Sequence, residues 1–300
     1  MHPTPHRRDN RSLRGARRRT ITFRQYYADY TTRQIWSPQT ARAVDLAARA
    51  FPFAEVPMRR LTPVHIETWV KKMHDKGLAA ATIRTRFANI RAILYAAQRD
   101  GAITHNPCTG VRLPRAKGRA TTASMPTPAQ VDQLVRTSPA PYDRLFAICA
   151  YAGLRLGEAR ALTWSDIDQE AGTIRVQRQS RLVPGGGFET TPPKYGSYRV
   201  VPMSAPLFDA LSRRPTPKNE LVVPGAGGEP VHPGSVARVW KHQKTSCGLP
   251  HALRLHDLRH FYASSLIASG ENVLTIQRRL GHARASTTLD VYGHALDWAN

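Results

Sequence analysis

The sequence is short of acidic residues, has few cysteines and contains no long apolar run. Asp and Glu number 21 against 44 Lys and Arg, which gives a formal net charge of +23 and a pI near 10.9. Such a deficit of acid makes nucleic acid the first partner to consider. A generic basic protein that contacts ribosomes or membrane surfaces is the alternative that charge alone leaves open.

The other scarcities exclude whole classes of protein. The 3 cysteines, Cys108, Cys149 and Cys247, lie far apart and form no C-x-x-C pair, which argues against a disulfide scaffold or a zinc site. No window reaches the roughly 18 apolar residues of a membrane span. The N-terminus lacks the apolar core of a signal peptide, so we expect a cytoplasmic chain without membrane contacts. The acidic residues form no cluster typical of a metal site, and we expect no cofactor.

Residue composition divides the chain into segments. Residues 1–20 are rich in arginine and almost devoid of apolar residues, so we expect a basic tail that is disordered when unbound; it could follow DNA phosphates or stay solvated. Residues 21–112 predict a helical domain, residues 113–126 have the composition of a linker, and residues 127–300 predict a second domain. The length allows two modest domains, each with its own core.

The first domain shows two clear helical patterns. Thr62 followed by Pro63 is typical of a helix start, and apolar residues then recur on one face until Gly77 (Ile66, Trp69, Val70 and Met73). Thr82 is expected to open a second helix with its own apolar face (Ile83, Phe87, Ile90 and Leu94). The arginines Arg84, Arg86 and Arg91 fall largely off that face, where a solvated surface and contacts with phosphate are both open.

The second domain is predicted to be mostly helical with a small sheet. Thr127 and Pro128 begin a capping-box pattern, and the apolar run 145–151 predicts a buried helix that leads directly to Arg155. Residues 173–177 and 198–201 predict short strands. The fold class expected for the whole chain is therefore mainly α with a small antiparallel β-sheet.

Residues suited to chemistry on an anion concentrate near the end of the chain. An arginine binds a phosphate through forked donors, a histidine exchanges a proton near neutral pH, and a tyrosine can act as a covalent nucleophile. His256 and Arg259 share a face if they lie on a helix. Gly281 follows a basic and apolar run, as at a left-handed helix cap, and this places His282 on a turn.

These motifs resemble those of the tyrosine recombinase (phage integrase) family. In chain order they are Gly-Leu-Arg-Leu-Gly-Glu at 153–158, a lysine in the hairpin-like segment 193–202, His-x-x-Arg at 256–259, Leu-Gly-His at 280–282 and finally Tyr292. Their order and spacing make the resemblance specific, and it extends over roughly residues 20–300.

The resemblance implies a set of catalytic residues with separate roles. Tyr292 would be the nucleophile, Arg155 and Arg259 would hold the scissile phosphate, His256 would exchange the tyrosine proton, His282 would hydrogen-bond a phosphate oxygen, and Lys194 would protonate the leaving 5′ oxygen. His260 and His294 would be helpers at most.

Two assignments leave alternatives open. The family's lysine usually follows a threonine, whereas Pro193 precedes Lys194 here, and Arg199 is a nearby competitor for the role of acid. Glu158 lies one helical turn after Arg155, where it either orients the guanidinium or forms a plain i,i+3 ion pair.

The resemblance also implies the overall activity: a site-specific DNA recombinase of the integrase type. It would enclose double-stranded DNA in a clamp made of a helical core-binding domain and a catalytic domain, with Arg84, Arg86 and Arg91 near phosphates. It would cleave through a 3′-phosphotyrosine and assemble as a homotetramer at synapsis, with neither metal nor ATP. Accessory DNA-bending or directionality factors are compatible with this function.

Other functions are compatible with the same motifs. A chromosome or plasmid dimer resolvase and a type IB topoisomerase would use the same chemistry, although the helical domain ahead of the linker favours recombination. A DNA-binding regulator with this fold would need no catalytic residues, and the complete catalytic set weighs against it.

Overall fold

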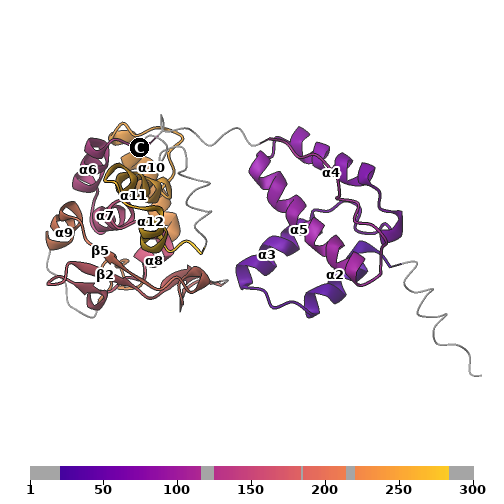
Figure 1. Ribbon diagram of the computed structural model, residues 1–300, viewed down its shortest axis with the longest axis horizontal. Coiled ribbons are helices and arrows are strands. Elements are labelled where there is room, and N and C mark those ends of the chain that lie inside the picture. Colours follow the sequence, from indigo (N-terminus) through magenta and orange to yellow (C-terminus); the bar gives the residue numbers. More distant parts are fainter. Residues whose placement is uncertain (1–20, 116–124, 184, 214–219, 284–300) are drawn as a thin grey trace, which may run out of the picture. The chain divides into compact units, whose positions relative to one another are not determined.

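The computed structural model describes residues 21–115, 125–183, 185–213 and 220–283 (Figure 1). The chain forms two compact units, Met1–Arg119 and Ala120–Asn300, each with its own hydrophobic core. Among the described residues, no helix is both long enough and apolar enough to cross a membrane. The basic tail at 1–20 and the nucleophile candidate Tyr292 lie outside the described residues.

The first unit is built of helices. Its described elements are α2 (Phe23–Thr32), α3 (Pro38–Arg49), the 3₁₀ helix η1 (Met58–Arg60), α4 (Pro63–Asp75) and α5 (Ala80–Arg99). Ser37 and Thr62 stand at the N-cap positions of α3 and α4, and each is followed by proline, as expected of a proline-initiated helix. The predicted start of α4 at Thr62 and Pro63 is confirmed.

The apolar stripes of α4 and α5 form much of the core of this unit. The predicted core residues of α4 are all buried, and so are those of α5. Phe51 lies between α2 and α4, with its ring centroid 4.8 Å from Phe23 and 5.1 Å from Trp69. The prediction that α5 starts at Thr82 is wrong: the helix begins at Ala80, because alanine favours helix strongly and extends it by half a turn.

In its described residues, the second unit combines helices with two small sheets. The helices are α6 (Pro128–Thr137), α7 (Tyr142–Tyr151), α8 (Leu156–Ala159), α9 (Ala205–Ser212), α10 (Pro233–Ser246), α11 (Asp257–Ala268) and α12 (Val273–Leu280), with 3₁₀ turns η3 (Trp164–Asp166) and η4 (Lys194–Gly196). Thr127 caps α6 through the predicted reciprocal bonds with Gln130. Helix α7 runs through the core and packs against α6, α9 and α11 (Figure 1).

The strands within residues 125–183 and 185–213 form two antiparallel sheets. One has the order β1 (Ile167–Asp168), β2 (Thr173–Val176), β5 (Arg199–Pro202), and the other pairs β3 (Gln179–Leu182) with β4 (Phe188–Thr191). In register, Val176 lies opposite Arg199 and Gln179 lies opposite Thr191. The chain is therefore longer between β4 and β5 than between β2 and β3. Lys194 lies in this longer connection, on η4, and not at the tip of a simple hairpin.

Candidate active site

Arg155 occupies a short bend between two helices. Helix α7 ends at Tyr151, and Arg155 is the N-cap residue of α8. Gly153 has a φ of 64°, and a Cβ atom there would overlap the ring of Tyr262. Only glycine lets the chain turn so tightly against α11. The buried helix and this turn together fix where Arg155 leaves the core.

The guanidinium of Arg155 is held from two sides. Its Nη1 atom donates to Oε1 of Glu158 at 2.8 Å, and its Nη2 atom donates to the carbonyl oxygen of Gly281 at 3.0 Å. The backbone N–H of Arg155 donates to Oε2 of Glu158 at 2.9 Å. The side chain remains 20% exposed, so a ligand can reach it. Arg155 is thus oriented and still accessible.

Arg259 binds the same two segments from a deeper position. It lies on α11 and is 3% exposed. Its Nη1 atom donates to the carbonyl oxygen of Gly153 at 2.6 Å, and its Nη2 atom donates to the carbonyl of Leu280. The two arginines therefore bind consecutive carbonyls at the C-terminal end of α12, where the helix dipole favours cations. Sequence spacing alone places neither arginine against α12.

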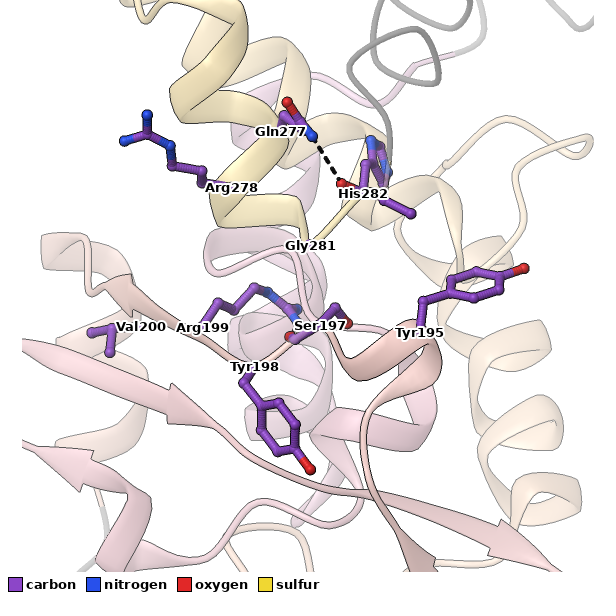
Figure 2. A pocket seen from close by; sticks show the side chains of 10 residues that line it. Tyr195, Ser197, Tyr198, Arg199, Val200, Gln277, Arg278, Gly281 and His282 are labelled. Atoms are coloured by element: carbon purple, nitrogen blue, oxygen red, sulfur yellow. Dashed lines mark hydrogen bonds between the residues drawn. The ribbon is translucent and has the colours of Figure 1, made fainter.

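The end of α12 forms the predicted left-handed cap. Gly281 has φ 63° and ψ 45°. The N–H of His282 donates to the carbonyl of Gln277 at 3.1 Å, and the Gln277 side-chain amide donates back to the carbonyl of His282 at 3.1 Å (Figure 2). These reciprocal bonds fix His282 immediately beyond the carbonyls that the arginines bind.

The two predicted histidines approach the arginines differently. His282 is half-buried, and burial together with the charges of Arg259 and Arg155 lowers its pKa to about 4. It is therefore neutral at pH 7 in the absence of a ligand. His256 is exposed and directly precedes α11. Its ring centroid lies 5.3 Å from that of His260.

Lys194 is exposed, and its Nζ atom lies 4.9 Å from the ring centroid of Tyr195. The backbone of Tyr195 has a φ of 61°, which is unusual for a residue other than glycine. The hydrogen bonds described for the arginine cluster do not include Lys194. The segment that carries it lines a pocket of about 440 Å³ with the end of α12, including Gly281 and His282 (Figure 2).

Arg199, the competitor of Lys194 in the sequence, has a different environment. Its side chain is 5% exposed and its Nη2 atom lies 2.7 Å from Oε2 of Glu158. Burial raises the pKa of the Glu158 carboxyl, but the hydrogen bonds and charges of Arg199 and Arg155 outweigh it and bring the pKa to about 2. Glu158 therefore holds both arginines, which is more than the i,i+3 pair that the sequence suggests. The alternation of residues along the strand could have indicated from the sequence that Arg199 is buried. Arg199 and Val201 face inward, whereas their neighbours are exposed.

The arginines predicted to contact DNA lie on α5 of the first unit. Arg84 donates from Nε and Nη2 to the carbonyl of Pro114 at 3.3 and 3.2 Å. Arg86 is partly exposed, while Arg91 is exposed and lines a pocket with Tyr95 and Arg99. Tyr95 and Arg99 follow Arg91 at helical spacing, which a search of the sequence for exposed positions on α5 could have found. His294 lies outside the described residues, as does Tyr292.

The sequence profile of the phage integrase family matches residues 126–298. The chain belongs to this family. Relatives include the ICEBs1 integrase of Bacillus subtilis (strain 168), with 28% identity over 81% of this chain and 69% of the relative. The putative prophage phiRv2 integrase of Mycobacterium tuberculosis (strain ATCC 25618 / H37Rv) is 30% identical over 81% of this chain and 65% of its own length. The tyrosine recombinase XerC of Agrobacterium fabrum (strain C58 / ATCC 33970) is 26% identical over 76% of this chain and 72% of the relative.

Solved integrase structures share the fold. The Tn1549 transposon integrase in complex with a circular intermediate DNA superposes with a TM-score of 0.78 at 23% identity, over 91% of this chain and 95% of that one. A lambda integrase tetramer bound to a Holliday junction gives a TM-score of 0.69 at 18% identity, over 94% and 84%. The predicted fold class is confirmed, and the phage integrase profile with its integrase and XerC relatives makes the chain a site-specific DNA recombinase.

Proposed function

We propose that the chain is an integrase-type recombinase that cleaves and rejoins duplex DNA through a phosphotyrosine on Tyr292. The observation that carries this proposal is the convergence of Arg155 and Arg259 on the carbonyls of Leu280 and Gly281, next to His282. Guanidiniums that are already oriented by the protein stabilise a phosphorane-like transition state at little cost in reorganisation. Relatives of the integrase type align at 28–30% identity and a XerC relative at 26%, so both support a recombinase.

The cleavage step balances with the residues of this chain. The Oη atom of Tyr292 attacks phosphorus, its proton passes to His256, and the bond from phosphorus to the 5′ oxygen breaks. Lys194 gives a proton to that oxygen, which leaves as a 5′ hydroxyl, while Arg155 and Arg259 hold the non-bridging oxygens. The reverse attack by another 5′ hydroxyl rejoins the strand. The phosphodiester energy is kept in the phosphotyrosine bond, so the step needs no ATP.

His282 completes the proposed phosphate site as a neutral hydrogen-bond donor. Burial, together with the charges of Arg259 and Arg155, lowers its pKa to about 4. A phosphate in the site adds negative charge beside the imidazole, which raises that pKa toward its ordinary value. With its pKa raised toward 6.5, His282 still stays mostly neutral at pH 7 and contributes a hydrogen bond to the phosphate.

The first unit is proposed to be the core-binding domain. The exposed face of α5 carries Arg91, Tyr95 and Arg99 around a pocket, a basic surface with an aromatic residue within it. Such a surface suits phosphate contacts with additional packing on sugar or base. Together the two units would bind double-stranded DNA, and four copies would assemble at synapsis, as in the lambda integrase tetramer bound to a Holliday junction.

A nicked suicide substrate tests the proposed nucleophile directly. On such DNA the parent protein should accumulate a covalent protein–DNA complex that survives denaturation, because the departed 5′ end diffuses away. Tyr292→Phe removes only the phenolic oxygen, so it should bind the site with parental affinity and form no covalent complex. A covalent complex that persists in this variant would place the nucleophile elsewhere. A parent protein that binds the site without forming one would support a DNA-binding regulator.

A further inference from the structure

Arg199 lies beside the proposed phosphate site with its side chain only 5% exposed, and its guanidinium donates four hydrogen bonds. Its Nη1 and Nη2 atoms donate to the two carboxylate oxygens of Glu158 at 3.2 and 2.7 Å. Its Nε atom donates to the carbonyl of Arg279 at 2.9 Å, and Nη1 also donates to the carbonyl of Ser197 at 3.2 Å. A side chain held in this way does not reach out to a substrate.

The same contacts join the two segments that orient Arg155. Glu158 binds the backbone N–H and the guanidinium of Arg155, and the last turn of α12 supplies the Gly281 carbonyl. Arg199 binds Glu158 on one side and that last turn on the other, through Arg279. Figure 2 shows its side chain running beneath the Gly281 turn toward Ser197.

Strand β5 gives Arg199 a rigid base. Arg199 pairs with Val176 in the antiparallel ladder between β2 and β5. Ser197, two residues earlier, accepts a hydrogen bond from Nη1 of Arg155 at 3.3 Å on its hydroxyl oxygen. The sheet is therefore linked to Arg155 twice, once through Ser197 and once through Arg199 and Glu158.

Charge balance gives Arg199 a role beyond packing. Two guanidiniums, those of Arg155 and Arg199, share one fully buried carboxylate. With Arg199 present, the two guanidiniums and the carboxylate together carry a net positive charge. The Arg155 guanidinium places this charge on the accessible side of the site. Without Arg199, the carboxylate would be neutralised by Arg155 alone, and its positive charge would no longer be available to an anion.

We propose that Arg199 is a positioning residue for the recombination reaction, which neutralises Glu158 and holds the end of α12 so that Arg155 faces the scissile phosphate with its charge available. This inference rests on the proposed function of Arg155 as a phosphate ligand. It assigns Arg199 no proton transfer and no contact with DNA.

The test compares strand cleavage on two substrates. One has an ordinary scissile phosphate, and the other has a methylphosphonate, in which a methyl group replaces one non-bridging oxygen and the diester is neutral. A defect in positive charge at the phosphate should be relieved on the neutral substrate, whereas a defect in folding or DNA binding should persist on both. Cleavage is read from the length of a labelled strand, and thermal unfolding and site affinity are measured for each variant.

Arg155→Ala should be slow on phosphate and relieved on methylphosphonate. Arg199→Met should lose on the order of a hundredfold in cleavage rate on phosphate, the scale of a small misplacement in an active site, and should be relieved in the same way. Because Arg199 acts through Arg155, the variant carrying both changes should be no slower than Arg155→Ala alone. Arg175→Met, on the neighbouring strand and outside the Glu158 contacts, should leave the ratio of the two rates unchanged.

A second variant tests the charge argument and protects against poor folding. Glu158→Gln combined with Arg199→Met removes both buried charges, so the Arg155 charge is available again and cleavage should be faster than with Arg199→Met alone. A double variant no faster than that single variant would overturn the inference, as would equal slowing of Arg199→Met on both substrates. If Arg155→Ala itself is not relieved on methylphosphonate, the proposed function of Arg155 fails. Relief of Arg155→Ala without relief of Arg199→Met refutes the role of Arg199 alone.

Discussion

The carboxylate of Glu158 lies 2.7 Å from Nη2 of Arg199, although the two residues are 41 positions apart in the sequence. Glu158 belongs to the helical turn that begins at Arg155, and Arg199 begins strand β5. Their pairing fastens a sheet to the helical turn that presents Arg155. Because both side chains are buried, the effect of breaking the pair should differ sharply from that of breaking a surface ion pair.

Glu158→Ala should lower the free energy of unfolding by about 3–5 kcal/mol, since it leaves a buried guanidinium without its carboxylate. Asp209 provides a matched control in the same unit. It pairs with Arg213 at 2.7 Å but is 69% exposed, and Asp209→Ala should cost less than about 1 kcal/mol. Urea unfolding of both variants measures the difference. Similar small losses in the two would show that the buried pair is dispensable.

Gly281→Ala should be more harmful than the same change at another left-handed glycine. A Cβ atom at Gly281 would lie 3.0 Å from Nη1 of Arg199 and 3.0 Å from Cβ of Ser197. Gly270 has a φ of 78°, but a Cβ atom added there would meet no described atom within 4 Å, so this position experiences the backbone cost alone. That cost is about 1–2 kcal/mol. Gly281→Ala should exceed it and also slow DNA cleavage, whereas Gly270→Ala should leave cleavage at the parental rate. Equal effects on cleavage would contradict this.

The stability of the protein should depend on His282 below neutral pH. The folded state lowers the pKa of His282 from 6.5 to about 4, so the unfolded chain takes up the proton first as the pH falls. This contribution to the free energy of unfolding is fully present above pH 6.5 and is lost progressively down to about pH 4. For a half-buried group the loss should be roughly 1–2 kcal/mol. Denaturant unfolding of the parent and of His282→Gln at several pH values isolates the contribution of His282, because the variant lacks it. Parallel curves of unfolding free energy against pH for the two proteins would argue against this contribution.

Lys194 is tested by changing the leaving atom. An alkoxide is a poor leaving group near neutral pH, so Lys194→Ala should cleave ordinary DNA very slowly. A substrate with sulfur at the bridging 5′ position leaves as a thiolate, and a thiol with a pKa of about 8.5 needs little help from an acid. Lys194→Ala should therefore cleave the sulfur substrate at nearly the parental rate.

The arginine variants provide the comparison for this experiment. Arg155→Ala and Arg259→Ala should stay slow on the sulfur substrate, because their proposed role is at the non-bridging oxygens. Arg199→Met should also stay slow, because in the parent protein the Arg199 guanidinium donates to Glu158 and to backbone carbonyls and is not the acid. Rescue of Arg199→Met by sulfur would make Arg199 the acid and would remove Lys194 from that role.

The exposed face of α5 should contribute to DNA affinity through counterion release. Arg91→Ala should reduce the slope of log affinity against log salt by about one and weaken binding to all sequences alike. Arg24 is a suitable control in the same unit because it is paired with Glu55. Arg24→Ala should change the slope less. An unchanged slope for Arg91→Ala would remove α5 from the proposed DNA surface.

Local patterns in the sequence determined the helix starts, the apolar helix faces and the family of this protein. The N-caps at Thr62 and Thr127, the apolar faces of α4 and α5 and the left-handed Gly281 all follow from the chemistry of neighbouring residues, and the structure has them as predicted. The family is also decided by sequence, because the spacing of its motifs between residues 153 and 292 can be read without coordinates.

Tertiary structure decided what each charged residue touches. Spacing along the chain gave Glu158 one partner, Arg155, and left Arg199 as a rival of Lys194; folding brought Arg199 inward on β5 and gave Glu158 two arginines. The carbonyls of Leu280 and Gly281 likewise became acceptors for Arg259 and Arg155 only when α12 packed beside α11 and β5. Local sequence specifies backbone conformation through interactions between near neighbours. A buried ion pair forms only when segments that are distant in the sequence pack together and exclude water from the two charges.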